Sequence, residues 1–411
     1  MKGGRAFTKP LPFVLGTNLG QVDYGADPTG MAAALSIGMS IIRDEIPWNF
    51  TKGGGITALE ATVGSYNSTN IATYASVAAT IKAAGMTPLF TVTVNEAPGL
   101  CPILNGALVS GNVYTSINVD AVPFVGSIGD SIVLTSPDQV HTQTVVLAQN
   151  ITYYEGGAIS VNSFTANFSY PTGTWVYDTA WVPCTPKHFS DAMAHLVAQT
   201  GMQGLNWELL NEPDGGGWNV SETLYVKMLS LAYPAMKAAD PTCIIHGLVL
   251  ASVAPQYFVN GTDYYNGCIT AAAALGLSLW NLYDVVSVHT YGSTSGFADY
   301  EPPDGYGSSF PMWLLLANFR ANMIAKGDTT LIWITEFGWQ NASDGPMTAQ
   351  LQAQYYQNYL VSLSGTDPVN NVLYSSYLKA MCQWAMGSGG ANWGIIGSST
   401  ATVLAELVTG H

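Results

Sequence analysis

Short apolar runs alternate with longer segments of helical periodicity over most of the chain. The apolar runs indicate strands buried on both faces of a parallel sheet, because they lack the strict alternation of a half-exposed strand. We predict eight such strands, at residues 13–19, 40–46, 88–94, 204–210, 243–250, 285–290, 331–335 and 378–385. Helical segments follow them at residues 31–38, 71–84, 186–199, 221–239, 311–325, 348–363 and 401–408, with further helical turns between the fifth strand and residue 275.

This order of elements predicts the fold class. Eight strands that are each followed by a helix fit a closed (β/α)8 TIM barrel, which is an α/β fold. A doubly wound open sheet is the alternative. Against it, no strand in this sequence is followed by the glycine-rich turn that cradles a phosphate group.

The alternation is interrupted after the third strand. Residues 105–180 contain short stretches of alternating polarity separated by Gly, Pro, Asn and Asp, which is typical of antiparallel strands. We therefore predict a small all-β module inserted after strand 3, which divides the chain into a first barrel part at 1–104, the module at 105–180 and a second barrel part at 181–411. Because loops after the strands form the active-site face of such barrels, the module should stand beside the site. A structural cap, a contact within a homo-oligomer and a wall of a substrate cleft are its alternative roles.

Two glutamates end predicted strands. Glu212 closes the segment N-W-E-L-L-N-E-P after the fourth strand, and Glu336 follows the seventh strand in L-I-W-I-T-E-F-G-W. Polar side chains at the C-terminal tips of barrel strands read as catalytic. The alternative is a pair of surface glutamates on unrelated loops.

These two motifs resemble the large clan of retaining glycoside hydrolases built on (β/α)8 barrels, which includes cellulases, β-mannanases, β-xylosidases and β-glucosidases. The resemblance covers the barrel and leaves out the inserted module. It implies that Glu336 is the nucleophile and Glu212 the general acid/base. Such chemistry needs carboxyl groups about 5–5.5 Å apart. We also expect the negative charge of Glu336 to raise the pKa of Glu212.

The same resemblance implies substrate-binding roles for five further residues. Asn211 would bind the sugar 2-hydroxyl, and His289 and Tyr291 would line the sugar subsite. Arg43 would hold the nucleophile in its ionised form, and Trp384 would form the floor on which a sugar stacks. A turn-forming Asn, a core His, a core Trp and a surface Arg are the plainer alternatives.

Other positions qualify this assignment. Glu208 lies four residues before Glu212 and competes with Glu336 as the partner of a buried Arg43. Trp48 and Trp339 follow strand ends, where they would line a cleft. The tip of the third strand carries no His, although many members of the clan have one there, which weakens a placement in the cellulase-like branch.

Composition excludes several classes of function. The chain has 12 Lys and Arg against 27 Asp and Glu, a net charge of −15, and an anionic surface repels nucleic acid. Its apolar stretches are shorter than the roughly 20 residues of a membrane-spanning helix. The sequence has no H-E-x-x-H motif and no G-x-S-x-G motif. We therefore expect no metal, no other cofactor and no serine nucleophile.

Weaker signals concern the compartment and the cysteines. No apolar signal-peptide segment is visible, but low charge and N-x-S/T sequons such as that at Asn150 suit an extracellular protein.

Cys101 and Cys184 flank the predicted module and form either a disulfide or two free thiols. Cys243 and Cys382 lie in apolar runs, where we expect buried thiols.

The sequence favours a retaining β-glycosidase that acts on β-linked oligo- or polysaccharides. A non-catalytic glycan-binding barrel and a transglycosylase with the same residues are the alternatives. The sugar, its linkage and the choice between endo and exo action do not follow from these residues.

Overall fold

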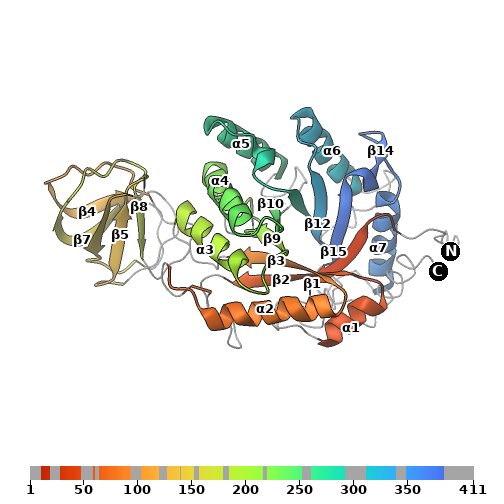
Figure 1. Ribbon diagram of the computed structural model, residues 1–411. Coiled ribbons are helices and arrows are strands. Elements are labelled where there is room, and N and C mark those ends of the chain that lie inside the picture. Colours follow the sequence, from red (N-terminus) through yellow and green to blue (C-terminus); the bar gives the residue numbers. More distant parts are fainter. Residues whose placement is uncertain are drawn as a thin grey trace.

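The computed structural model describes residues 11–18, 28–47, 59–60, 64–93, 103–119, 127–138, 140–151, 157–178, 185–215, 220–251, 261–291, 312–338 and 349–383. Within these residues, eight parallel strands close into a barrel, which confirms the predicted fold class (Figure 1). Around the barrel, neighbouring strands follow the order β1 (Val14–Asn18), β15 (Leu378–Gln383), β12 (Leu331–Gly338), β11 (Val285–Tyr291), β10 (Ile244–Leu250), β9 (Asn206–Leu209), β3 (Thr87–Thr93) and β2 (Ile41–Pro47).

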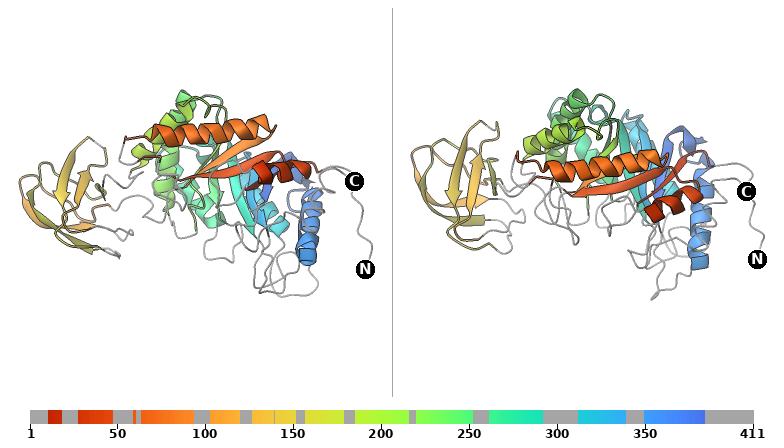
Figure 2. Two further views of the ribbon diagram at one scale, coloured as in Figure 1. Left: turned by 90° about the horizontal axis from the view of Figure 1, so that it is seen from below. Right: turned by 60° about the horizontal axis from the view of Figure 1, so that its bottom comes forward.

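Helices cover the outside of the barrel (Figures 1 and 2). They are α1 (Pro28–Ser36), α2 (Ser68–Ala83), α3 (Pro186–Ala198), α4 (Glu222–Ala239), α5 (Gly261–Ala274), α6 (Met312–Ala325) and α7 (Ala349–Leu363). The start of α4 follows from its capping residue, because the Ser221 hydroxyl accepts a hydrogen bond from the Leu224 amide. The predicted closing helix at 401–408 lies outside the described residues.

The barrel strands are buried on both faces, as their apolar runs predict. In β3 all residues after Thr87 are buried, and all four residues of β9 are buried. The barrel strands nevertheless contain polar side chains with no solvent exposure, namely Thr17, Arg43, Thr91, Glu208, His246, Ser287, His289, Thr290, Thr335 and Gln383. These side chains need partners inside the barrel, and the site described below supplies many of them.

Several strand ends differ from the predicted bounds by one to three residues, and two of these differences affect the site. Strand β12 continues to Gly338, so Glu336 lies within the strand and pairs with His289 of β11. Strand β9 ends at Leu209, because Leu210 has a φ of +68° and leaves the extended conformation.

The inserted segment forms two small antiparallel sheets with their own hydrophobic cluster. One pairs β4 (Val113–Val119) with β7 (Gly157–Thr165), and the other has the order β6 (Thr142–Val146), β5 (Ser131–Thr135), β8 (Trp175–Asp178). Figures 1 and 2 show these sheets to one side of the barrel, next to α3. The module bounds of 105–180 and its proposed roles stay predictions.

Side chains of β5 and β8 dock the module on the barrel. The rings of Tyr177 and of His188 on α3 pack nearly perpendicular to each other, with centroids 5.5 Å apart. Val133 and Trp175 pack against the hydrophobic cluster of the barrel. Ile103, which precedes the module sheets, bridges to Trp175, so the two ends of the insertion lie side by side.

Cys243 and Cys382 are buried free thiols, as predicted, and Cys268 is a third. Cys101 and Cys184 lie outside the described residues. None of the described helices combines the length and the apolar character that crossing a bilayer requires.

Candidate active site

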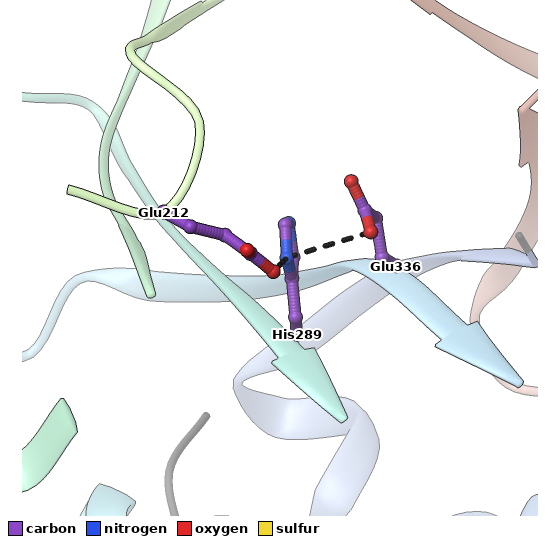
Figure 3. Close-up of side chains that lie close together, drawn as sticks. All are labelled: Glu212, His289 and Glu336. Carbon is purple, nitrogen blue, oxygen red and sulfur yellow. Dashed lines mark hydrogen bonds and ion pairs between the residues drawn. The ribbon is translucent and has the colours of Figure 1, made fainter. Parts of the chain in front are cut away.

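Glu212, His289 and Glu336 meet at the C-terminal ends of barrel strands: Glu212 follows β9, and His289 and Glu336 lie on the adjacent strands β11 and β12. Figure 3 shows the imidazole of His289 between the two carboxyl groups. His289 Nδ1 lies 2.7 Å from Glu212 Oε1 and 3.6 Å from Glu336 Oε2. One carboxyl oxygen of Glu212 lies within 4.8 Å of one of Glu336. The Glu212 side chain is 20% exposed and that of Glu336 is 4% exposed, so a ligand would reach the pair from the side of Glu212.

The guanidinium of Arg43, on β2, joins Glu208 of β9 to Glu336 of β12. Its Nε donates to Glu208 Oε2 at 2.7 Å, and its Nη1 donates to Glu336 Oε1 at 2.6 Å. Its remaining bonds run from Nη1 to Asn18 Oδ1 at 3.1 Å and from Nη2 to Asn211 Oδ1 at 2.8 Å. The sequence left Glu208 and Glu336 as competing partners of Arg43, and the structure joins Arg43 to both.

The charges in this network are fixed by their mutual contacts. Burial opposes the charge of Arg43, but Glu208 and Glu336 raise its pKa above the ordinary value. Burial likewise acts against the charge of Glu208, yet Arg43 and then His289 lower its pKa to about 2. The Thr91 hydroxyl also donates to Glu208. Arg43 and Glu208 therefore stay ionised at any working pH.

The pKa of Glu212 is shifted in the opposite direction from the rise that the sequence led us to expect. Burial acts to raise the pKa of Glu212, but the hydrogen bond from His289 and the charges of His289 and Arg43 outweigh it, so its pKa lies below the usual value. Burial acts to lower the pKa of His289, but Glu336 and Glu212 raise it overall. In this arrangement the pair's proton resides on His289, which explains why the expected rise for Glu212 is not seen.

The backbone around Glu212 is strained. Leu210 and Glu212 have φ values of +68° and +47°. Such left-handed conformations in residues other than glycine cost about 1–3 kcal/mol each and cluster at functional sites. Glu212 also precedes Pro213, a position that restricts its backbone further. The turn is closed by the Gly215 amide, which donates to the Glu212 carbonyl at 3.0 Å.

The structure describes some of the other sequence-predicted residues and leaves others out. Asn211 lies beside Glu212 and contacts Arg43. Arg43 and His289 have no exposed surface, so they would act on a ligand through the carboxylates that they bind. Tyr291 ends β11, but its side chain lies outside what is described. The indoles of Trp48, Trp339 and Trp384 also fall outside the described residues.

Sequence reasoning missed two polar side chains of the network. Asn18 ends β1 and accepts a hydrogen bond from Arg43. Thr91 lies in the buried part of β3 and donates to Glu208. The sequence feature that could have identified both is the same: each is a polar residue in a strand that is otherwise predicted to be buried on both faces.

The donors of Glu212, His289 and Glu336 could also hold a divalent metal ion, since they lie within 4.8 Å of one another. Two carboxylate oxygens and one imidazole nitrogen are a ligand set that Zn²⁺ accepts. A metal at Nδ1 would have to displace the proton that His289 holds against Glu212. The arrangement as it stands combines a proton donor and acceptor with a second carboxylate oriented by Arg43.

No family model matches the sequence, and no curated protein matches it. Solved structures do resemble it. A family 39 glycoside hydrolase from the gut symbiont Bacteroides cellulosilyticus has a TM-score of 0.52 and 14% identity, with 97% of this chain covering 64% of that one. A glucosidase from Croceicoccus marinus has a TM-score of 0.54 and 12% identity, covering 98% of this chain and 68% of the other.

An endo-β-1,4-glucanase from Xanthomonas axonopodis pv. citri has a TM-score of 0.52 and 13% identity, covering 97% of this chain and 99% of the other. This chain thus spans less than two thirds of the length of the family 39 enzyme, but nearly all of the glucanase. At these identities, the likeness shows that the chain shares the barrel fold of these glycoside hydrolases.

Proposed function

We propose that this protein is a retaining glycosidase that hydrolyses β-linked saccharides by double displacement. Glu336 is the nucleophile and Glu212 the general acid/base. The observation that carries the proposal is the approach of their carboxyl oxygens to within 4.8 Å. Retaining enzymes place the two carboxyl groups about 5–5.5 Å apart, whereas inverting enzymes need about 6.5–9.5 Å to admit a water molecule.

In the first step, Glu336 attacks the anomeric carbon while the bond to the leaving oxygen breaks. Arg43 holds Oε1 of Glu336 at 2.6 Å and so orients the attacking carboxylate. The leaving oxygen takes a proton from Glu212. Because Glu212 Oε1 lies 2.7 Å from His289 Nδ1, the proton that the pair shares can reach Glu212 as the leaving oxygen gains charge.

In the second step, water displaces Glu336 from the glycosyl ester. Esterification removes the negative charge of Glu336, which is among the causes that raise the pKa of His289. Glu212, now deprotonated, accepts a proton from the attacking water. The second inversion at the anomeric carbon restores its original configuration.

The structural neighbours support a saccharide substrate, because they are described as a glucosidase, an endo-β-1,4-glucanase and a family 39 glycoside hydrolase. We therefore propose β-linked gluco- or manno-saccharides as the first substrates to test, and an extracellular setting in which such polymers occur. A transglycosylase would share every residue named above and differ only in the acceptor.

The test is a panel of phenyl, 4-nitrophenyl and 2,4-dinitrophenyl β-glycosides together with β-1,4-glucan and β-1,4-mannan. Glu336→Gln and Glu212→Gln should each abolish hydrolysis of the phenyl glycosides, and Glu222→Gln on α4 is the matched control. Product configuration, followed by NMR during hydrolysis, should be β at first. An α-product, or full activity in Glu336→Gln, would refute the mechanism, and a wild-type protein that binds glycans without cleaving them would identify a glycan-binding barrel.

A further inference from the structure

The strained turn that carries Glu212 needs something to hold it. Leu210 and Glu212, on either side of Asn211, both have left-handed backbone conformations. Such conformations persist only where the surrounding structure over-determines them. The turn's own bond between Gly215 and Glu212 does not reach Leu210, so contacts from outside the turn must fix its start.

The start of the turn is held by Tyr225 of α4, a residue with no exposed surface. Its hydroxyl donates to the carbonyl of Leu209, the last residue of β9, at 3.2 Å. The same hydroxyl accepts a hydrogen bond of 2.9 Å from the Leu248 amide. Leu248 has a φ of +52° and lies where the pairing of β10 with β11 shifts register. One hydroxyl thus joins two neighbouring strands at the irregular point of each.

The end of the turn is held by Asp214, which is 2% exposed. Its Oδ1 accepts a hydrogen bond of 2.8 Å from the Ala251 amide, directly after β10. Its Oδ2 is buried and has no hydrogen-bond partner among the residues that the structure describes. A buried carboxyl oxygen left without a partner is costly, so its presence at this position calls for an explanation.

We propose that Tyr225 and Asp214 are positioning residues that clamp the two ends of the Glu212 turn to β10 and thereby fix the acid/base carboxyl group. The inference rests on the proposed function. Neither residue would contact the sugar, and both act through the placement of Glu212. Loss of either clamp lets the turn relax toward unstrained backbone and moves Glu212 away from the leaving oxygen.

The leaving group provides a readout that a general loss of stability would not produce. A phenyl leaving group needs protonation, whereas the far more acidic 2,4-dinitrophenol departs without it. In Tyr225→Phe we expect kcat/KM for the phenyl β-glycoside to fall about tenfold, part of the full general-acid contribution, with less than about a twofold change for the dinitrophenyl glycoside. Tyr265→Phe is the matched control, since its hydroxyl bonds Asp328 at 3.0 Å, away from the turn. It should leave the ratio of the two rates unchanged.

Asp214 supplies an independent second test. Asp214→Ala removes the acceptor of the Ala251 amide and should show the same selective loss on the phenyl glycoside. Asp214→Asn keeps an acceptor oxygen and should restore the wild-type ratio. Because this pair of variants does not involve Tyr225, it decides the question even if Tyr225→Phe fails to fold.

Equal losses on both glycosides, or an unchanged ratio in Tyr225→Phe and Asp214→Ala, would overturn the positioning role while leaving the glycosidase assignment intact. A wild-type protein that cleaves neither glycoside would overturn the proposed function and the clamp together. The two failures are therefore distinguishable from the wild-type rates alone.

Discussion

Arg43 donates a 2.6 Å hydrogen bond from Nη1 to Oε1 of Glu336, and both side chains are almost wholly closed to solvent. Charge-assisted bonds of this kind are strong and directional. Because both partners are buried, removing one is strongly destabilising: it leaves the other as an uncompensated buried charge. The first prediction below follows from this property of Arg43 and Glu336.

The first prediction concerns Arg43→Lys. An ammonium group retains the charge, but it cannot match the planar fork that contacts Glu208, Glu336 and Asn211 together. We expect the free energy of unfolding to fall by about 1–3 kcal/mol, because buried acceptors lose their hydrogen bonds. The value of kcat for the dinitrophenyl glycoside should also fall, because the orientation of Glu336 is lost. Urea unfolding and steady-state kinetics measure the two effects, and an unchanged kcat would contradict the orienting role.

The second prediction concerns His289→Gln and the pH profile. In the wild type, the proton of the Glu212–His289 pair is held by His289, whose pKa lies above its usual value. Without the imidazole, that proton must reside on Glu212 alone, a group with a lower intrinsic pKa. The basic limb of the kcat/KM profile should therefore move to lower pH in the variant. A basic limb that stays in place would show that the pair does not store the catalytic proton.

The third prediction concerns acid stability. His246 is fully buried, and this burial lowers its pKa to about 4. Below about pH 6.5 the unfolded chain binds a proton that the folded protein resists, so stability falls as the pH drops toward 4. The loss from this group should reach about 3 kcal/mol. Urea unfolding at pH 7 and pH 4 should show a shallower decline in His246→Gln than in the wild type, and equal declines would refute the assignment.

The fourth prediction has the opposite sign. Burial raises the pKa of Asp214 to about 6, so the folded state favours the protonated carboxyl group. The contribution of this group to the free energy of unfolding is complete below about pH 4 and is lost as the pH rises through about 6. In Asp214→Asn the side chain does not ionise, so this pH-dependent loss of stability disappears. The variant should be more stable than the wild type at pH 7.5, by up to about 3 kcal/mol, and the advantage should vanish at pH 4. Equal stability at pH 7.5 would contradict the prediction.

The barrel was predictable because its strands obey a simple physical rule. Strands buried on both faces are mostly apolar, and residues such as Ile245 and Val286 have no exposed surface. The two glutamates stand out by the same rule, because strand propensity does not favour a carboxylate at the end of such a buried strand. Their proximity then follows from closure of the barrel.

The rest of the site depends on contacts that no local pattern encodes. The lowered pKa of Glu212 arises from His289, which lies 77 residues away along the chain. Tyr225 looks like an ordinary core aromatic of an amphipathic helix, and Asp214 looks like a turn residue. Only their hydrogen bonds to Leu248 and Ala251 distinguish them from such residues.

The bridge between Ile103 and Trp175 bears on the order in which the chain folds. Closing the barrel requires Leu89 of β3 to pair with Asn206 of β9, across the whole insertion. The entropic cost of such a closure grows with the number of flexible residues enclosed. A module that has already folded around its own cluster brings residues 103 and 175 together, so that closure spans only residues 89–103 and 175–206. Early folding of the module would thus shorten the chain separation that this strand pairing must bridge and speed assembly of the barrel.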